Sequence, residues 1–162
     1  MQVRPAIPSE FASVGELTVS AFRALGPQGP AGSSYELELR DVAGRAGVGE
    51  VLVATHGQRI VGSVTLVAGG TAFAEIAGEG EMSFRMLAVD PHSQGQGIGA
   101  VLVGACLDRA RAAGASRVVI STAAAMHAAH RLYERSGFTR DPARDWAPHP
   151  GLLLLAYRHD LG

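Results

Sequence analysis

The chain has 162 residues, 47% of them hydrophobic and 18% charged, and its net charge is −1 at pH 7. This composition predicts one folded domain over residues 1–162 and excludes a disordered chain. The near-neutral charge excludes the electrostatic footprint of general nucleic-acid binding. No apolar run approaches the ~20 residues of a membrane span, and the first five residues lack the pattern of a secretory signal. We therefore expect a cytoplasmic protein with no nucleic-acid or membrane partner.

The first half of the chain predicts a strand, two helices and a hairpin. Hydrophobic residues recur at helical spacing from Phe11 to Leu25 and again from Tyr35 to Val42. The expected elements are a strand from Val3, a helix capped by Ser9, a loop over 26–32, a helix over 34–46, and strands over 51–55 and 59–67 joined by a tight turn. A loose, glycine-rich connection follows.

A long strand is expected over residues 81–89. In a regular strand the side chains alternate between faces, so Glu81, Leu87 and Val89 are expected on one face, and Phe84 and Met86 on the other. This alternation defines which side chains of the strand share a surface.

The second half predicts a helix after the glycines, a strand over 117–122, a helix over 125–136 ended by Gly137, a strand from Phe138, and a buried strand over 151–157. Gly114 is expected to end the first of these helices, and three prolines break the segment 141–150. Strands and helices mixed in this way predict an α/β fold, with a mixed central β-sheet flanked by helices.

Three glycines at alternate positions, Gly95, Gly97 and Gly99, separate the 81–89 strand from the following helix. Glycines at the start of a helix leave its first N–H groups uncovered, and those groups carry the positive end of the helix dipole. Such a site suits a phosphate or pyrophosphate. The sequence therefore predicts that a phosphorylated cofactor binds here.

Two common phosphate-binding loops do not fit. A nucleotide P-loop needs a lysine after its last glycine, whereas Ala100 follows Gly99 and all 14 basic residues of the chain are arginine. The dinucleotide fingerprint is formally matched by Gly95, Gly97 and Ala100, but it requires the glycines directly after the strand and an acidic residue at the end of the next one. Here a turn intervenes, and the next strand ends in alanines.

Two segments together resemble the GCN5-related N-acetyltransferase (GNAT) family. The strand 86–91 followed by Gln94–Gly99 (QGQGIG) fits the family motif Arg/Gln-x-x-Gly-x-Gly/Ala, and Ala129–Phe138 (AHRLYERSGF) is similar to A-x-x-L-Y-E-x-x-G-F. The element order agrees along nearly the whole chain. The resemblance implies the acyl-CoA N-acyltransferase fold, in which helices flank both faces of the sheet and a splayed V opens between the fourth and fifth strands.

The resemblance also implies that acetyl-CoA is the cosubstrate and which residues bind it. Backbone N–H groups would bind the pyrophosphate at Gln94, Gly95, Gln96, Gly97, Ile98, Gly99 and Ala100. The strand Leu87, Ala88 and Val89 would pair with the pantetheine arm, and an N–H there could hold the thioester oxygen as it becomes an oxyanion. Met126 stands where the family commonly has asparagine, so its contact with the cofactor would be apolar.

Two side chains are expected to move protons. Tyr133 matches the family's general acid, which protonates the departing thiolate, although a buried core tyrosine is the simpler alternative. Glu81 is the candidate general base because it shares a strand face with Leu87 and Val89 in the expected alternation, and Glu79 is the reserve. A solvated carboxylate or a water-mediated base is the alternative.

Other chemistry is not expected. His127, His130 and Glu134 share a helix face, but no second cluster completes a metal site, so no metal is predicted. Cys106 is expected to be a buried residue on the far side of its helix from the chemistry, which disfavours an acyl-enzyme. The segment 26–33 and Trp146 fall where the family places substrate clefts.

The sequence therefore predicts an acetyltransferase that moves an acetyl group from acetyl-CoA directly to a primary amine of a small molecule or peptide. The alternative is a non-catalytic acyl-CoA-binding domain of the same fold, acting as a sensor or partner, and Met126 gives it weight. Family members are often dimers, so a homodimer stays open. Loops determine the acceptor, and their shape cannot be read from the sequence.

Overall fold

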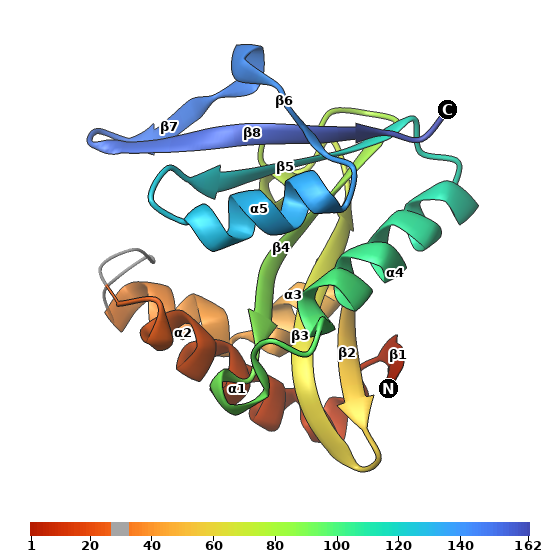
Figure 1. Cartoon of the computed structure of the whole chain (residues 1–162), viewed down its shortest axis with the longest axis vertical. Helices are drawn as coiled ribbons and strands as arrows, with labels where there is room; N and C mark the ends of the chain where they lie inside the picture. The colour runs from red at the N-terminus through yellow and green to blue at the C-terminus, as the bar shows by residue number, and fades with distance from the viewer. Residues whose placement is uncertain (27–32) are drawn as a thin grey trace.

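The computed structural model describes residues 1–26 and 33–162, and these residues form one mixed sheet with helices on both faces (Figure 1). The loop expected over 26–32 therefore lies outside the described residues except for Gly26. The described part contains no helix that is both long and apolar enough to cross a membrane.

The sheet contains eight strands: β1 (Gln2–Pro5), β2 (Glu50–His56), β3 (Arg59–Ala68), β4 (Glu81–Val89), β5 (Arg117–Ala123), β6 (Thr139–Arg140), β7 (Trp146–His149) and β8 (Leu152–Asp160). Their order is β1-β2-β3-β4-β5-β8-β6, and β7 pairs with β8. Only the β4–β5 neighbours are parallel among the described strands. The expected mixed α/β fold is confirmed.

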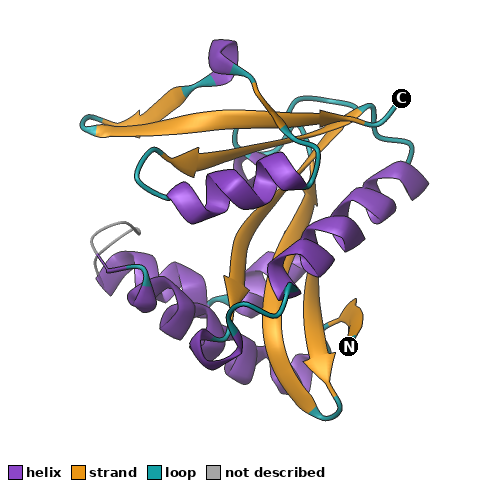
Figure 2. Ribbon diagram, viewed as in Figure 1, coloured by secondary structure: helices purple, strands orange, loops and turns teal. Residues whose placement is uncertain are grey.

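In the described residues, five α-helices cover the two faces: α1 (Phe11–Ala24), α2 (Ser33–Arg40), α3 (Val42–Val48), α4 (Ile98–Ala112) and α5 (His127–Arg135). Short 3₁₀ turns are η1 (Pro8–Glu10), η3 (Ala72–Ala74), η4 (Pro91–Ser93) and η5 (Pro142–Arg144). Helices α4 and α5 pack in the largest apolar cluster, whereas α1, α2 and α3 pack in two clusters against the opposite face (Figure 2).

The helix expected over 34–46 is two helices. The backbone leaves the helical region at Asp41, whose carboxylate accepts a hydrogen bond from the N–H of Gly44 and so begins α3. Leu39 and Val42, expected on one inward stripe, are indeed buried but pack in different clusters. The first helix also differs from the expectation: Ser9 lies within η1 and no side chain caps α1.

Close approach between the sheet and α4 depends on Gly62 of β3. A Cβ atom there would lie 2.9 Å from both Ile98 Cγ2 and Leu102 Cδ1, and 3.1 Å from the carbonyl oxygen of Ala88. The absent side chain therefore lets the start of α4 rest on β3 and β4. This packing fixes the glycine segment at the ends of those strands.

The last strand is longer and less buried than expected. It runs from Leu152 to Asp160, and Leu153 is 53% exposed. Both β6 and β7 pair with parts of its edge. The proline-broken segment 141–150 contains η5 and β7. The connection between β3 and β4, which the sequence suggested was loose, contains η3.

Candidate active site

The glycine segment forms an open turn in front of α4. Gly95 and Gly97 have φ of 79° and 77°, a left-handed conformation that favours glycine. Gly97 is the N-cap of α4, and no side chain in the described part of the chain caps the helix. A Cβ atom at either glycine would meet nothing within 4 Å, so the backbone faces open space. Uncapped N–H groups at the positive end of a 15-residue helix fit an anionic diphosphate.

The side chains around this turn are drawn away from it. Asp90 accepts the N–H of His92 and pairs with Arg59, and the amide of Gln94 donates to the carbonyl oxygen of Val89 at 3.3 Å. At Gly99, an added Cβ would lie 3.1 Å from Leu132 Cδ2 of α5. Gly97 is thus required by backbone conformation, whereas Gly99 is required by the contact between α4 and α5.

Strands β4 and β5 part soon after they begin. Their parallel pairing joins Glu81 with Arg117 and Met82 with Val118, and no further pair is formed among the described residues. From this point β4 stays beside β3, and β5 stays beside β8 (Figure 1). The inner edge of β4 beyond Met82 therefore keeps backbone groups free for an added strand-like ligand. The expected V lies between these two strands.

A β-bulge at Met86 breaks the alternation expected along β4. Met86 has φ of 55°, and the register with β3 shifts between Ser63 and Thr65. Met86 packs with Val19 and Leu39 on the α1–α2 face, whereas Leu87 and Val89 pack with Phe84 on the α4–α5 face.

The bulge overturns one step of the sequence argument for a base at Glu81. Leu87 and Val89 change faces relative to the first half of β4, so Glu81 does not share their face. The extra residue at the bulge was not visible in the sequence, because Met86 is an ordinary strand residue with no glycine beside it. The bulge also bends β4 and turns its edge next to the V.

Tyr133 lies on α5 in an aromatic cluster under the V. Its ring centroid is 5.8 Å from that of Phe84, 5.9 Å from Phe138 and 6.1 Å from Tyr157. Burial raises the pKa of the Tyr133 hydroxyl above its ordinary value. No hydrogen bond joins this hydroxyl to another described residue, in contrast to Tyr157, whose hydroxyl lies 3.4 Å from Glu134 Oε1. Tyr133 therefore keeps its proton at neutral pH, and its hydroxyl can donate a hydrogen bond to a ligand.

Cys106 of α4 packs in the same cluster as Tyr133 and is close enough to affect the pKa of the Tyr133 hydroxyl, so it does not lie on the far side of its helix as expected. It is 0% exposed, and burial raises the pKa of its thiol to about 12. A thiol in this state is a poor nucleophile, because the thiolate is the reactive form.

Met126 is the N-cap residue of α5 and follows the end of β5. Its sulfur lies 3.8 Å from the hydroxyl oxygen of Thr122, and its side chain is half-buried. Nearby, a ring nitrogen of His130 lies 3.0 Å from the carbonyl oxygen of Ala123. The end of β5 is thus bordered by an apolar thioether where an amide would supply hydrogen bonds.

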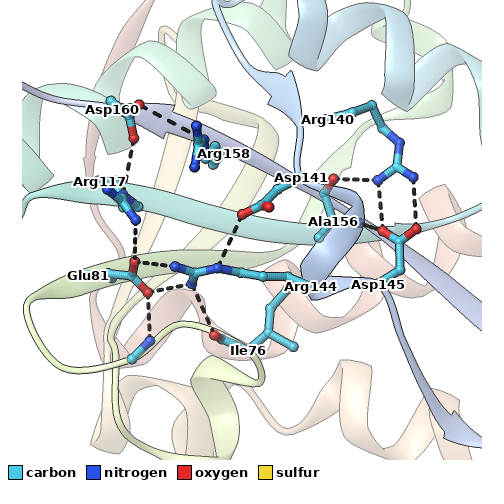
Figure 3. A network of polar contacts seen from close by, with 11 residues as sticks. Ile76, Glu81, Arg117, Arg140, Asp141, Arg144, Asp145, Ala156, Arg158 and Asp160 are labelled. Carbon is cyan, nitrogen blue, oxygen red and sulfur yellow. Dashed lines mark hydrogen bonds and ion pairs between the residues drawn. The ribbon is translucent and has the colours of Figure 1, made fainter.

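Glu81 is held by two arginines at the closed end of the V (Figure 3). Its carboxylate oxygens lie 2.6 and 2.8 Å from the guanidinium of Arg144, and one lies 3.4 Å from Arg117. The N–H of Gly78 also donates to it at 2.9 Å. The hydrogen bonds from Arg144 lower the pKa of this carboxyl against the opposing effect of burial.

The other carboxylates near β4 differ in exposure. The reserve base Glu79 is exposed in the turn before β4. Glu75, which the sequence did not single out, directly follows η3 and its side chain is only 18% exposed. Its Oε1 lies 3.4 Å from Nε of Arg85. A glutamate in an irregular, glycine-rich connection carries no periodic signal, so the sequence could not place it beside β4.

A cavity of about 550 Å³ opens on the α2–α3 face of β4. Its lining includes Phe73 of η3 and Arg85 and Met86 of β4, and Glu38, Asp41 and Arg45 border it from α2 and the start of α3. The bulged residue Met86 therefore borders both this cavity and the parting strands.

Metal ligands do not gather in the described part of the chain. No three histidine, cysteine, aspartate or glutamate side chains there come close enough to hold an ion. His127 and His130 instead stack edge to face, with ring centroids 5.7 Å apart.

The comparison with protein families identifies this architecture. The model of the acetyltransferase (GNAT) family matches residues 13–138, more than half of the chain. The chain therefore belongs to the acetyltransferase (GNAT) family, whose members transfer an acetyl group from acetyl-CoA. A comparison with curated protein sequences found no match.

Solved structures share the fold at low sequence identity. A GNAT-family acetyltransferase from Staphylococcus aureus Mu50 is 15% identical, with a TM-score of 0.77 and 99% of each chain covered. The protein yncA from Salmonella typhimurium, solved with its cofactor acetyl-CoA, is 20% identical with a TM-score of 0.71 and covers 100% of this chain and 94% of its own. The ribosomal-protein-S18-alanine N-acetyltransferase from Escherichia coli is 15% identical, with a TM-score of 0.72 and coverages of 99% and 94%.

Proposed function

We propose that this protein is an N-acetyltransferase that moves the acetyl group of acetyl-CoA directly to a primary amine of a small-molecule or peptide acceptor. The observation that carries the proposal is the parting of β4 and β5 between the start of α4 and a buried tyrosine. Among the described residues, no side chain caps this helix and the tyrosine hydroxyl has no hydrogen-bond partner. The family and the fold support acyl transfer, and the amine acceptor is the finer part of the proposal.

The proposal includes the residues that would hold acetyl-CoA. The N–H groups from Gln94 to Ala100 would bind the diphosphate, and Leu87, Ala88 and Val89 would pair with the pantetheine arm through the free edge of β4. Met126 would add an apolar contact. The cosubstrate supplies the activated thioester, whose carbonyl oxygen an N–H of β4 can stabilise.

In the reaction, the neutral acceptor nitrogen forms a bond to the thioester carbon, and the C–S bond then breaks. Tyr133 donates its proton to the leaving sulfur and recovers one from the acceptor nitrogen, so the products are the amide and the free thiol. The burial and high thiol pKa of Cys106 support this direct route over an acyl-enzyme.

For the general base, the carboxylates suggested by the sequence are weak candidates in this geometry. Two guanidinium groups hold the pKa of Glu81 low, and a carboxyl with a low pKa is a weaker proton acceptor. Glu79 is exposed, so water competes for its contacts. The replacement of either residue by glutamine tests its part in the reaction.

A second candidate function is an acyl-CoA-binding domain without catalysis. The observation in its favour is Met126, whose thioether cannot make the hydrogen bonds of an asparagine at the end of β5. A cytoplasmic location and a homodimer also belong to the proposal. So does a peptide acceptor, which draws on the Escherichia coli relative that acts on a ribosomal-protein alanine.

The test is release of free thiol from acetyl-CoA in a screen of primary amines, peptides with a free N-terminus and amino acids. An enzyme gives thiol release that saturates with one class of acceptor, and mass spectrometry finds the acetylated amine. A binding domain gives saturable acetyl-CoA affinity in calorimetry and no thiol release with any acceptor.

A further inference from the structure

Glu75 occupies a place that none of the expected site residues fills. It lies against β4 on the face opposite Tyr133, in the connection between β3 and β4. There Arg85 lies 4.5 Å above the ring of Phe73, donates to its carbonyl oxygen at 3.4 Å, and pairs with Glu75 at 3.4 Å. These contacts hold the carboxylate of Glu75 against Arg85, which directly follows Phe84 in β4.

Glu75 also reaches the other side of the V. The buried hydroxyl of Ser121 in β5 has no hydrogen-bond partner at normal distance among the described residues. It nevertheless lies close enough to Glu75 to lower the pKa of that carboxyl. In the parallel register, Met82 lies opposite Val118, so Arg85 and Ser121 are each three residues further on. Glu75 thus spans β4 and β5 at one level, just beyond the point where they part.

The backbone at Glu75 is held in an uncommon conformation. Its φ is 57° and its ψ is −105°, outside the regions that residues other than glycine populate readily. Such a conformation costs about 1–3 kcal/mol and persists only when surrounding contacts impose it. Here the η3 turn and the ion pair with Arg85 impose this backbone conformation, and they hold the carboxylate against β4.

The electrostatics at Glu75 differ from those at Glu81. Burial is the largest effect and raises the pKa of Glu75, while Arg85 from β4 and Ser121 from β5 lower it. Tyr35 of α2 also lies within electrostatic range. A carboxyl that is raised in pKa and still accessible is a stronger proton acceptor than one held by two arginines.

We infer that Glu75 is the general base, taking one proton from the acceptor ammonium on the face of the sheet opposite Tyr133. The inference rests on the proposed function. The cavity bordered by Phe73, Arg85 and Met86 reaches the residue that Glu75 contacts, Arg85, and the Glu75 side chain itself keeps 18% of its surface exposed. The ammonium loses one proton to Glu75, which passes it to water. The nitrogen then bonds to the thioester carbon, and its second lost proton balances the one that Tyr133 gives to sulfur.

Glu75→Gln keeps the size of the side chain and removes the base. With the acceptor identified by thiol release, we expect kcat/KM near neutral pH to fall about 100-fold or more. The deficit should shrink as rising pH deprotonates the free amine, and acetyl-CoA affinity in calorimetry should not change. Glu16→Gln, an exposed glutamate of α1 that also pairs with an arginine, is the matched control, and Glu79→Gln and Glu81→Gln test the competing carboxylates.

A readout without turnover comes from the free protein. With ¹³C-labelled glutamate, the resonance missing in Glu75→Gln should titrate above the ordinary glutamate range. A rate and pH profile equal to wild type in Glu75→Gln overturns the assignment while leaving the acetyltransferase intact, as does a loss of thermal stability with an unchanged pH profile. If wild-type protein releases no thiol with any amine, the proposed function fails, and the role of Glu75 fails with it.

Discussion

Tyr133 and Glu75 lie on opposite faces of the sheet, at the level where β4 leaves β5. The ring of Tyr133 packs on Phe84, and the carboxylate of Glu75 pairs with Arg85, the next residue of the strand. Because neighbouring residues of a strand point to opposite faces, Phe84 and Arg85 hold Tyr133 and Glu75 on opposite sides of β4. The two groups can act on a reacting centre between the strands without neutralising each other.

Replacement of Tyr133 by phenylalanine should slow turnover without weakening acetyl-CoA binding. The ring keeps its contacts with Phe84 and Phe138, while the only group lost is the hydroxyl that has no partner among the described residues. We expect kcat to fall about 100-fold, as for removal of a general acid. Steady-state kinetics and calorimetry measure the two effects. Tyr157→Phe is the control, and an equal loss in both variants would assign Tyr133 to packing alone.

The glycine turn can be tested by a pair of substitutions with equal backbone strain. Gly97 and Gly114, at opposite ends of α4, have φ of 77° and 79°, and neither has a neighbour within 4 Å of an added Cβ. Glutamate at either position should cost about 1–2 kcal/mol of stability. Only Gly97→Glu should also abolish acetyl-CoA binding, because its carboxylate repels the diphosphate. Similar acetyl-CoA affinities for both variants in calorimetry would exclude this turn as the anion site.

The sequence predicted most of the secondary structure because hydrophobic spacing and glycines mark helices and strands locally. Such local signals marked the strand 81–89, the start of α4 after Gly97, and the helix and turn of Ala129–Phe138 that follow β5. The break at Asp41 was missed because the hydrophobic stripe continues across it. Only the hydrogen bond from the N–H of Gly44 to the Asp41 carboxylate marks the start of the second helix.

The site was less predictable, because it depends on contacts between distant segments. The bulge at Met86 follows from the register with β3, and it reversed the faces of Leu87 and Val89. Arg144 lies 63 residues from Glu81, and a pairing over that separation leaves no pattern in the sequence. Glu75 was missed because it lies in an irregular connection, where no periodic pattern indicates that it contacts Arg85 of β4.

The close packing of β3 on α4 predicts opposite effects for two glycines. In Gly62→Ala the new Cβ would press on Ile98, Leu102 and the backbone of Ala88, so unfolding free energy should fall by about 1–3 kcal/mol. Acetyl-CoA affinity should fall as well, because the start of α4 is displaced. Gly104→Ala, within α4 and with open space at its Cβ, should stabilise the protein by up to about 1 kcal/mol. Urea unfolding and calorimetry check both, and an unperturbed Gly62→Ala would show that this contact does not position α4.

The ion pair between Glu81 and Arg144 should make stability depend on acid pH. Because the pKa of Glu81 is lowered in the folded state, its contribution is complete above the ordinary glutamate pKa and is lost as pH falls through the folded value. Arg144→Met leaves a buried carboxylate with Arg117 alone, so stability at pH 7 should fall by about 2–3 kcal/mol. Glu81→Gln should show a smaller loss at pH 7 and a flatter acid limb in urea unfolding between pH 7 and 3, with exposed Glu79→Gln matching wild type. The double variant should be less destabilised than the sum of the single ones, since the two side chains contact each other. Additive losses, or an acid limb unchanged by Glu81→Gln, would show that this pair does not stabilise the closed end of the V.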